Sequence, residues 1–214
     1  MKNPLFCLFL VIALPLSAAP ADPKPRESIL FNTDWRFQQG DPEGTGDTLD
    51  YAHLKPWLLP TANQFVITPP AIRPEGEAPG EKSRFALPAF NDSKWRKLNL
   101  PHDWGIEGPF DQKLPGETAK LPWAGIAWYR KTFDLPPTDA GRPIYLEIDG
   151  AMSYSAVWCN GKFVGGWPYG YASYRLDLTD FLKPGAKVKV EFRRGEETIT
   201  MEATLTARPR ERRN

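Results

Sequence analysis

The chain has 214 residues, which is enough for one sizeable domain with a hydrophobic core. Its 27 Lys and Arg residues nearly balance its 26 Asp and Glu residues, so the net charge is +1. There is no basic field to attract nucleic acid or an anionic membrane, and we expect neither as a partner. The two histidines lie far apart and fit no metal-ligand spacing with a cysteine, so we expect no metal site and no cofactor.

Residues 1–21 have the features of a secretory signal peptide. Lys2 provides a short positive region, residues 5–16 form an apolar run, and residues 19–21 match the A-x-A cleavage pattern. The run is too short for a comfortable transmembrane span, so we expect cleavage, export to the periplasm or the extracellular space, and no stable membrane anchor. An uncleaved anchor is the alternative. Cleavage leaves Cys159 without a cysteine partner, and we expect it to be a packed residue rather than a reactive thiol.

The next part of the chain is mostly irregular. Residues 22–28 contain two prolines and predict a flexible lead-in, and residues 29–37 predict the first strand region. Residues 40–84 carry repeated Pro and Gly turn signals and are interpreted as a long loop insertion, with a candidate short strand at 64–67. Residues 91–93 match both a glycosylation sequon and a turn, and we favour the turn. We find no segment with sustained helical periodicity.

The strongest strand signals follow. Ile144, Leu146 and Ile148 alternate with residues that suit a solvent-facing surface, which is the period of a half-buried strand. Further strands are expected at 95–100, 128–133, 174–178 and 188–192. Short strands separated by turn signals favour an all-β fold built as an antiparallel sandwich.

Asn160 and Gly161 stand between two short apolar runs. A type I′ turn needs positive φ at both central residues, and Asn-Gly meets this need with little strain, so the sequence predicts a tight β-hairpin. The two-residue turn sets three facing pairs: Cys159 with Lys162, Trp158 with Phe163, and Val157 with Val164.

Several motifs in this order carry a family resemblance. They are L-P-H-D-W at 100–104, W-Y-R-K-x-F at 128–133, G-R-x-I-x-L-x-I-D-G at 141–150, V-W-C-N-G-K-x-V-G at 157–165, G-Y at 170–171 and D-L-T-x-x-L at 177–182. Together they resemble the N-terminal sugar-binding domain of glycoside hydrolase family 2, which includes β-galactosidases, β-glucuronidases and β-mannosidases. The L-P-H-D-W segment is typical of β-galactosidase-like members. The resemblance implies an antiparallel jelly-roll β-sandwich, galactose-binding-domain-like, over residues 29–192.

After Phe192 the sequence departs from that family. Relatives continue with R-V-D-N and then S-R-W-Y-x-G-x-G, which this chain lacks. Residues 193–214 are therefore interpreted as an atypical tail, with a candidate strand at 198–205 and an unstructured basic end. A frameshift or an early stop is the favoured explanation, and a natural short form is the alternative.

The resemblance also implies where catalysis occurs in the family. Its members are retaining glycosidases, which need two carboxylates about 5–5.5 Å apart. Relatives carry both on a (β/α)₈ barrel that follows this domain, and such a barrel takes about 250 residues. We therefore assign no catalytic residue, and we expect the 214-residue chain by itself to lack hydrolase activity.

Candidate sugar contacts lie in two loops. His102, Asp103 and Trp104 suit a substrate-binding rim, because carboxylates accept hydrogen bonds from sugar hydroxyls and aromatic faces pack on C–H surfaces. The alternative is that they stabilise the loop and the core. Trp167 and Tyr169 are further candidates, either as a sugar platform or as a contact for later domains.

The expected partners are a carbohydrate, β-galactoside-like, and the downstream domains of the same enzyme. Two other functions stay open. One is a free-standing carbohydrate-binding module, and the other is a structural or interaction β-sandwich.

Overall fold

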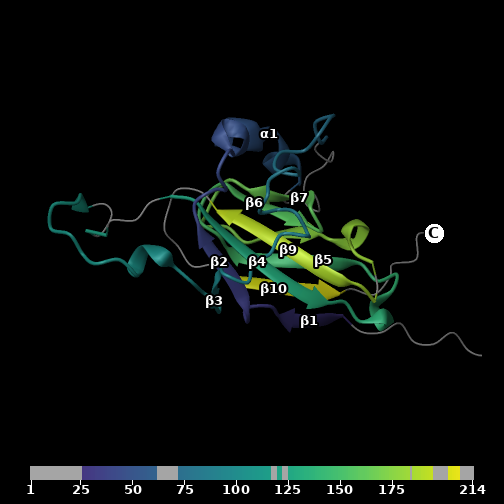
Figure 1. Ribbon diagram of the computed structural model, residues 1–214. Coiled ribbons are helices and arrows are strands. Elements are labelled where there is room, and N and C mark those ends of the chain that lie inside the picture. Colours follow the sequence, from purple (N-terminus) through teal and green to yellow (C-terminus); the bar gives the residue numbers. More distant parts are fainter. Residues whose placement is uncertain are drawn as a thin grey trace, which may run out of the picture.

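The protein is a β-sandwich, and one of its faces carries a cover made of helix α1 (Tyr51–Thr61) and the loops beside it (Figure 1). The computed structural model describes residues 26–61, 72–116, 120–121, 125–183, 185–194 and 202–207. A four-stranded sheet has the order β1-β10-β5-β8, a six-stranded sheet has the order β3-β2-β4-β9-β6-β7, and every pairing is antiparallel. The expected all-β antiparallel sandwich is confirmed.

The strands are β1 (Glu27–Leu30), β2 (Trp35–Gln39), β3 (Arg96–Leu98), β4 (Ala127–Asp134), β5 (Ile144–Gly150), β6 (Ser155–Cys159), β7 (Lys162–Trp167), β8 (Tyr174–Asp177), β9 (Lys187–Arg194) and β10 (Glu202–Ala207). The helices are α1 (Tyr51–Thr61) and the short 3₁₀ turns η1 (Gly46–Leu49), η2 (Trp104–Ile106), η4 (Pro137–Asp139) and η5 (Thr179–Phe181). No helix in the described ranges is long and apolar enough to cross a membrane.

The inner core lies between the two sheets. The alternation predicted for β5 is confirmed, because Ile144, Leu146 and Ile148 are all buried there. Tyr129 of β4 and Phe192 of β9 face them from the six-stranded sheet. Each such side chain contributes about 1.5–3 kcal/mol when it leaves water, so this layer is the main source of stability.

A second core lies on the outer face of the six-stranded sheet. Successive residues of a strand point to opposite faces, so Trp128 faces outward where Tyr129 faces inward. Trp128 and Trp158 are fully buried there beneath Leu54 and Leu58 of α1. Figure 1 shows α1 lying over β6 and β7. The tryptophans predicted to be core residues (Trp35, Trp95, Trp128 and Trp158) are all buried.

Helix α1 corrects the expectation of a helix-free loop insertion at 40–84. Pro56 and Pro60 lie inside the helix and would normally interrupt it, which is why the sequence pattern concealed it. Two features outweigh them. The Asp50 carboxylate accepts the backbone N–H of His53 at 2.9 Å near the helix start, and the apolar side of the helix packs on the sheet.

The hairpin prediction is confirmed at its turn and wrong one step further along. Asn160 and Gly161 have φ values of 52° and 80°, and the pairs nearest the turn are the predicted ones. Val157, however, pairs with Gly165 rather than with Val164, because a β-bulge lies between Val157 and Trp158. The extra residue shifts every later side chain of β7 relative to its partner strand.

Two segments outside residues 29–192 also pair in the sandwich. Strand β1 begins at Glu27, inside the expected lead-in, and β10 lies inside the expected tail, between β1 and β5. The candidate strand at 198–205 is observed over 202–207. The preferred turn at 91–93 is confirmed, because the Asn91 side chain accepts the backbone N–H of Ser93. The predicted signal peptide and the candidate strand at 64–67 lie outside the described residues.

Candidate functional site

The predicted site loops both reach toward one end of the six-stranded sheet. Pairing places five residues at that end: Gln39, Ala127, Arg194, Ser155 and Trp167. Strand β3 also begins there, because Arg96 pairs with Phe37. We call this the site end. The loop after β7 starts at the site end, whereas the loop after β3 leaves the opposite end, where Leu98 pairs with Trp35, and turns back along Phe37 and Tyr129. More than sixty residues separate the two loops in the sequence.

His102 is an internal support of the site end. Its imidazole is buried, with Nδ1 at 2.9 Å from the Tyr129 hydroxyl and Nε2 at 3.1 Å from Oε1 of Glu107. The ring also meets Phe37 edge-on, with 4.7 Å between centroids. Because both ring nitrogens have protein partners, the geometry favours anchoring over proton transfer to a substrate. A direct sugar contact by His102 stays a prediction.

Glu107 connects this histidine to β3. Its carboxylate receives both terminal nitrogens of Arg96, one of them at 2.6 Å, and this pair lowers the pKa of Glu107 to about 2. The bond with Arg96 is the largest cause of this low pKa, partial burial opposes it, and the bond with His102 is a smaller cause in the same direction as Arg96. The loop after β3 is therefore fastened to its own strand by a two-pronged ion pair.

Asp103 and Trp104 shape the short turn η2. Oδ1 of Asp103 accepts the backbone N–H of Gly105 at 2.9 Å, as a helix cap does. Trp104 is buried and packs against Phe37 and Tyr129, with centroids 5.9 and 6.4 Å apart. The half-buried Asp103 lies on the loop surface, while Trp104 holds that loop to the core.

Trp167 and Tyr169 lie at the same end but at the opposite edge of the sheet, where β7 ends. Trp167 is half-buried against the inner core, and its indole N–H donates to no acceptor in the described part of the chain. Tyr169 is 58% exposed, and its ring lies 5.7 Å from that of Tyr171. Trp123, another loop aromatic, lies outside the described residues.

Two other loop carboxylates serve local turns. Oδ1 of Asp111 accepts the backbone N–H of Lys113, and Oδ1 of Asp177 accepts that of Thr179, each at 2.9 Å. Among the described residues, no group of three or more His, Cys, Asp or Glu side chains is placed to hold a metal ion. Cys159 is buried, and burial raises the pKa of its thiol, so it is a packed residue as expected.

Sequence reasoning missed the supports of the candidate site. Tyr129 and Glu107 hold His102, and Arg96 holds Glu107. Tyr129 belongs to the motif at 128–133, but that motif does not show which residue its hydroxyl contacts, and Arg96 and Glu107 lie in no motif. The alternating pattern 95–100 did place Arg96 on a strand. The partner of Arg96 is Glu107, and this pairing depends on the path of the loop after β3, which sequence periodicity does not encode.

These features define a galactose-binding-type β-sandwich whose loops gather at one end. A family model described as "Glycosyl hydrolase 2 galactose-binding domain-like" matches residues 100–210. The chain belongs to this domain family of glycoside hydrolase family 2.

The relatives are much longer proteins. The chain is 37% identical to the β-galactosidase BoGH2A of Bacteroides ovatus over 161 residues, which is 74% of this chain and 14% of that protein. It is 39% identical over 102 residues to a putative β-glucuronidase of Formosa agariphila, covering 47% of this chain and 10% of that protein. A crystal structure of a β-glycosidase from Bacteroides vulgatus superimposes with a TM-score of 0.58 at 27% identity, over 84% of this chain and 20% of that chain.

Proposed function

We propose that this chain is the N-terminal carbohydrate-binding domain of an exported, β-galactosidase-like glycoside hydrolase. In this proposal the site end forms one wall of the substrate pocket. The observation that carries it is that two loops reach toward the same end of the six-stranded sheet: His102–Trp104, packed on Phe37 and Tyr129, and Trp167–Tyr169, at the end of β7. The similarity to the β-galactosidase of Bacteroides ovatus over 74% of the chain supports the galactoside preference.

The site end would bind the sugar and would take no part in hydrolysing its glycosidic bond. Asp103 and Tyr169 offer a carboxylate and an aromatic face at the loop surface, which suit sugar hydroxyls and C–H groups respectively. Hydrolysis with retention requires a separate carboxylate pair, which we assign to another domain. The 214-residue chain should then bind galactosides weakly without turning them over.

A projecting arm supports contact with another domain. The teal segment that includes residues 107–116 extends away from the sandwich in Figure 1. Ile106 and Phe110, at its start and within it, are 69% and 74% exposed. Large apolar side chains in such a position mark an interaction surface. This feature also favours the second candidate function, a domain that acts only by packing against a partner.

Saturation-transfer NMR on the full chain separates these functions. The probes are methyl β-galactoside and methyl β-glucuronide at millimolar concentration. We expect transfer to the galactoside, reduced severalfold by Asp103→Asn and Tyr169→Ala and retained by the exposed control Thr138→Val. An absence of transfer to both sugars would overturn the carbohydrate role and leave the packing role. Preferential transfer to the glucuronide would overturn the galactoside assignment.

Export is the remaining part of the proposal. It is supported by the pattern of residues 1–21. Expression of the full gene product in a Gram-negative host, followed by cell fractionation and N-terminal sequencing, provides the test. We expect the protein outside the cytoplasm with Asp22 as its first residue. An intact Met1 in the cytoplasmic fraction would contradict export.

A further inference from the structure

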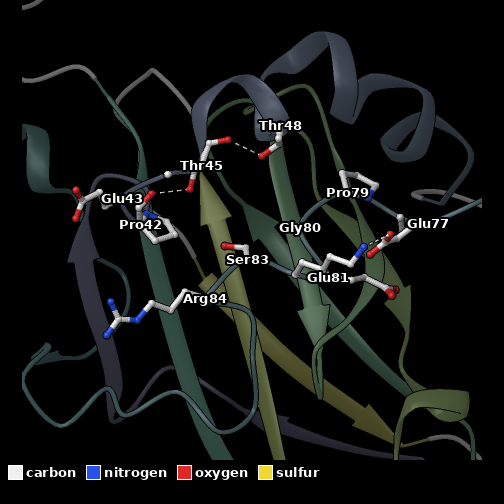
Figure 2. Close-up of a pocket in the computed structure, with 13 residues that line it drawn as sticks. Pro42, Glu43, Thr45, Thr48, Glu77, Pro79, Gly80, Glu81, Ser83 and Arg84 are labelled. Carbon is white, nitrogen blue, oxygen red and sulfur yellow. Dashed lines mark hydrogen bonds and ion pairs between the residues drawn. The ribbon is translucent and has the colours of Figure 1, made fainter.

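A cleft opens on the outer face of the six-stranded sheet, opposite to the face on which His102 packs. Its two walls are residues 42–48, which follow β2, and residues 77–84, which precede β3 (Figure 2). The cleft has a volume of about 510 Å³, and a hollow of about 390 Å³ adjoins it, sharing Thr48, Glu77 and Pro79. Both volumes lie in the range of small-ligand sites, about 300–1,000 Å³. The walls lie outside residues 100–210, which the family model matches.

Both walls are fixed to the sheet beneath them. The Trp128 indole N–H donates to Oδ1 of Asp41 at 2.8 Å, next to the first wall. The Trp158 indole N–H donates to the carbonyl of Pro79 at 3.0 Å, within the second wall. Glu81, also in the second wall, accepts the backbone N–H of Phe163. A site whose walls are held in this way loses little conformational entropy when it binds.

Some hydroxyl groups of the lining can still accept hydrogen bonds from a ligand. The hydroxyls of Thr45 and Thr48 donate to the carbonyls of Pro42 and Thr45, each at 2.7 Å, so their lone pairs remain available as acceptors. The Ser83 hydroxyl oxygen is buried and makes no hydrogen bond to the part of the chain that the structure describes. Figure 2 shows Ser83, a residue of the second wall, near the middle of the lining. A buried hydroxyl without a partner is costly, so folding alone does not explain a serine at this position of the lining.

The charges of the lining favour an uncharged ligand. Four carboxylates line the cleft and the adjoining hollow (Glu43, Asp47, Glu77 and Glu81), against the two strong bases Lys82 and Arg84. Lys82 is paired with Glu77 at 2.6 Å, and Lys162, outside the lining, is paired with Glu81 at 2.8 Å. Glu43, Asp47 and Arg84 are left, so the negative charge exceeds the positive charge by one. The surplus of negative charge repels an anionic ligand, whereas carboxylates readily accept hydrogen bonds from neutral hydroxyl groups.

The adjoining hollow supplies an aromatic surface. Trp57 of α1 lines it together with His53 and Thr48, and the indole is half-buried. Hydroxyl acceptors, carboxylates and an indole are the groups that recognise a sugar ring. We infer that this cleft and hollow form a second carbohydrate site, which binds a neutral saccharide chain across Ser83, Thr48 and Trp57.

Affinity electrophoresis of the full chain tests this second site. The probes are soluble mannan, xylan and dextran cast into native gels, with polygalacturonate as an anionic comparison; galactose polymers are left out because the site end is proposed to bind them. We expect retardation by at least one neutral polysaccharide and none by polygalacturonate. Thr48→Val and Ser83→Ala should each weaken the apparent affinity about fivefold, the loss expected for one net hydrogen bond. Glu77→Gln supplies a third variant if either fails to keep the wild-type unfolding midpoint.

Two controls separate this site from the site end. Thr138→Val removes a hydroxyl from an exposed threonine of η4 that does not line the cleft, and Asp103→Asn alters the other binding face. Both should leave the retardation unchanged. The second site is overturned if no neutral polysaccharide retards the wild type, if the three cleft variants bind as the wild type does, or if Asp103→Asn abolishes the retardation.

Discussion

The indole rings of Trp128 and Trp158 stack with 5.1 Å between centroids and 24° between planes. They come from β4 and β6, which flank β9, so the stack spans three strands on the outer face. Each indole N–H is also bonded to a different covering segment. The stack therefore joins the sheet to the cover and fixes the distance between the cleft walls.

Gly80→Ala should distort the second wall of the cleft. Gly80 has φ +76°, and an added Cβ would lie 2.5 Å from the Trp158 ring. Gly44, in the first wall, has φ +85° with nothing within 4 Å, so Gly44→Ala tests backbone strain alone. We expect Gly80→Ala to lower the free energy of unfolding about 1–3 kcal/mol more than Gly44→Ala does, measured by urea denaturation. Equal losses of stability in the two variants would show that the loop carrying Gly80 moves away from the Trp158 ring at no cost.

Arg130→Met should detach the segment before β3. The buried guanidinium donates to the Asp92 carboxylate at 3.0 Å and to the carbonyls of Phe85 and Leu87. We expect a loss of about 3–5 kcal/mol in the free energy of unfolding, because several buried acceptors lose their donor. The half-exposed Arg26 is the control, and Arg26→Met should cost less than about 1 kcal/mol. Similar losses for the two variants would contradict the docking role.

Glu191 should make the protein more stable as pH falls through the neutral range. Burial raises the pKa of Glu191 to about 8, and Arg130, its neighbour at 3.1 Å, opposes the rise. The Arg130 guanidinium is shared with a second carboxylate, that of Asp92 at 3.0 Å. The folded state therefore binds a proton that the unfolded state releases above its ordinary pKa of about 4.3.

The measurement is the urea unfolding free energy between pH 8 and pH 5, compared with Glu191→Gln. The wild type should gain stability relative to the variant as pH is lowered across this window. A constant difference between the two proteins would show that Glu191 stays ionised.

Glu107 should have the opposite effect at acidic pH. Because Arg96 holds the pKa of Glu107 at about 2, the folded state disfavours its protonation. The stabilisation is present above the ordinary carboxyl pKa of about 4.3 and is lost as pH falls toward 2. Thermal unfolding of the wild type and of Glu107→Gln should therefore converge over this range. Parallel curves would mean that the ion pair with Arg96 contributes nothing to folding.

The sequence predicted those features that depend on neighbouring residues. Asn160 and Gly161 determine a two-residue turn through their tolerance of positive φ, and the alternation of Ile144, Leu146 and Ile148 determines which face of β5 is buried. The motif order also predicted the domain family. These signals are local, because each needs only the chain within a few residues.

Tertiary structure alone decided the rest. Helix α1 forms despite Pro56 and Pro60 because the outer face of the sheet offers Leu54 and Leu58 a place to be buried. Strand β10 pairs between β1 and β5, and no short motif in its own sequence indicated these partners. The cleft and the site end each combine segments far apart in the chain. Their energies come from contacts across the sheet, and no local pattern of residue types records such contacts.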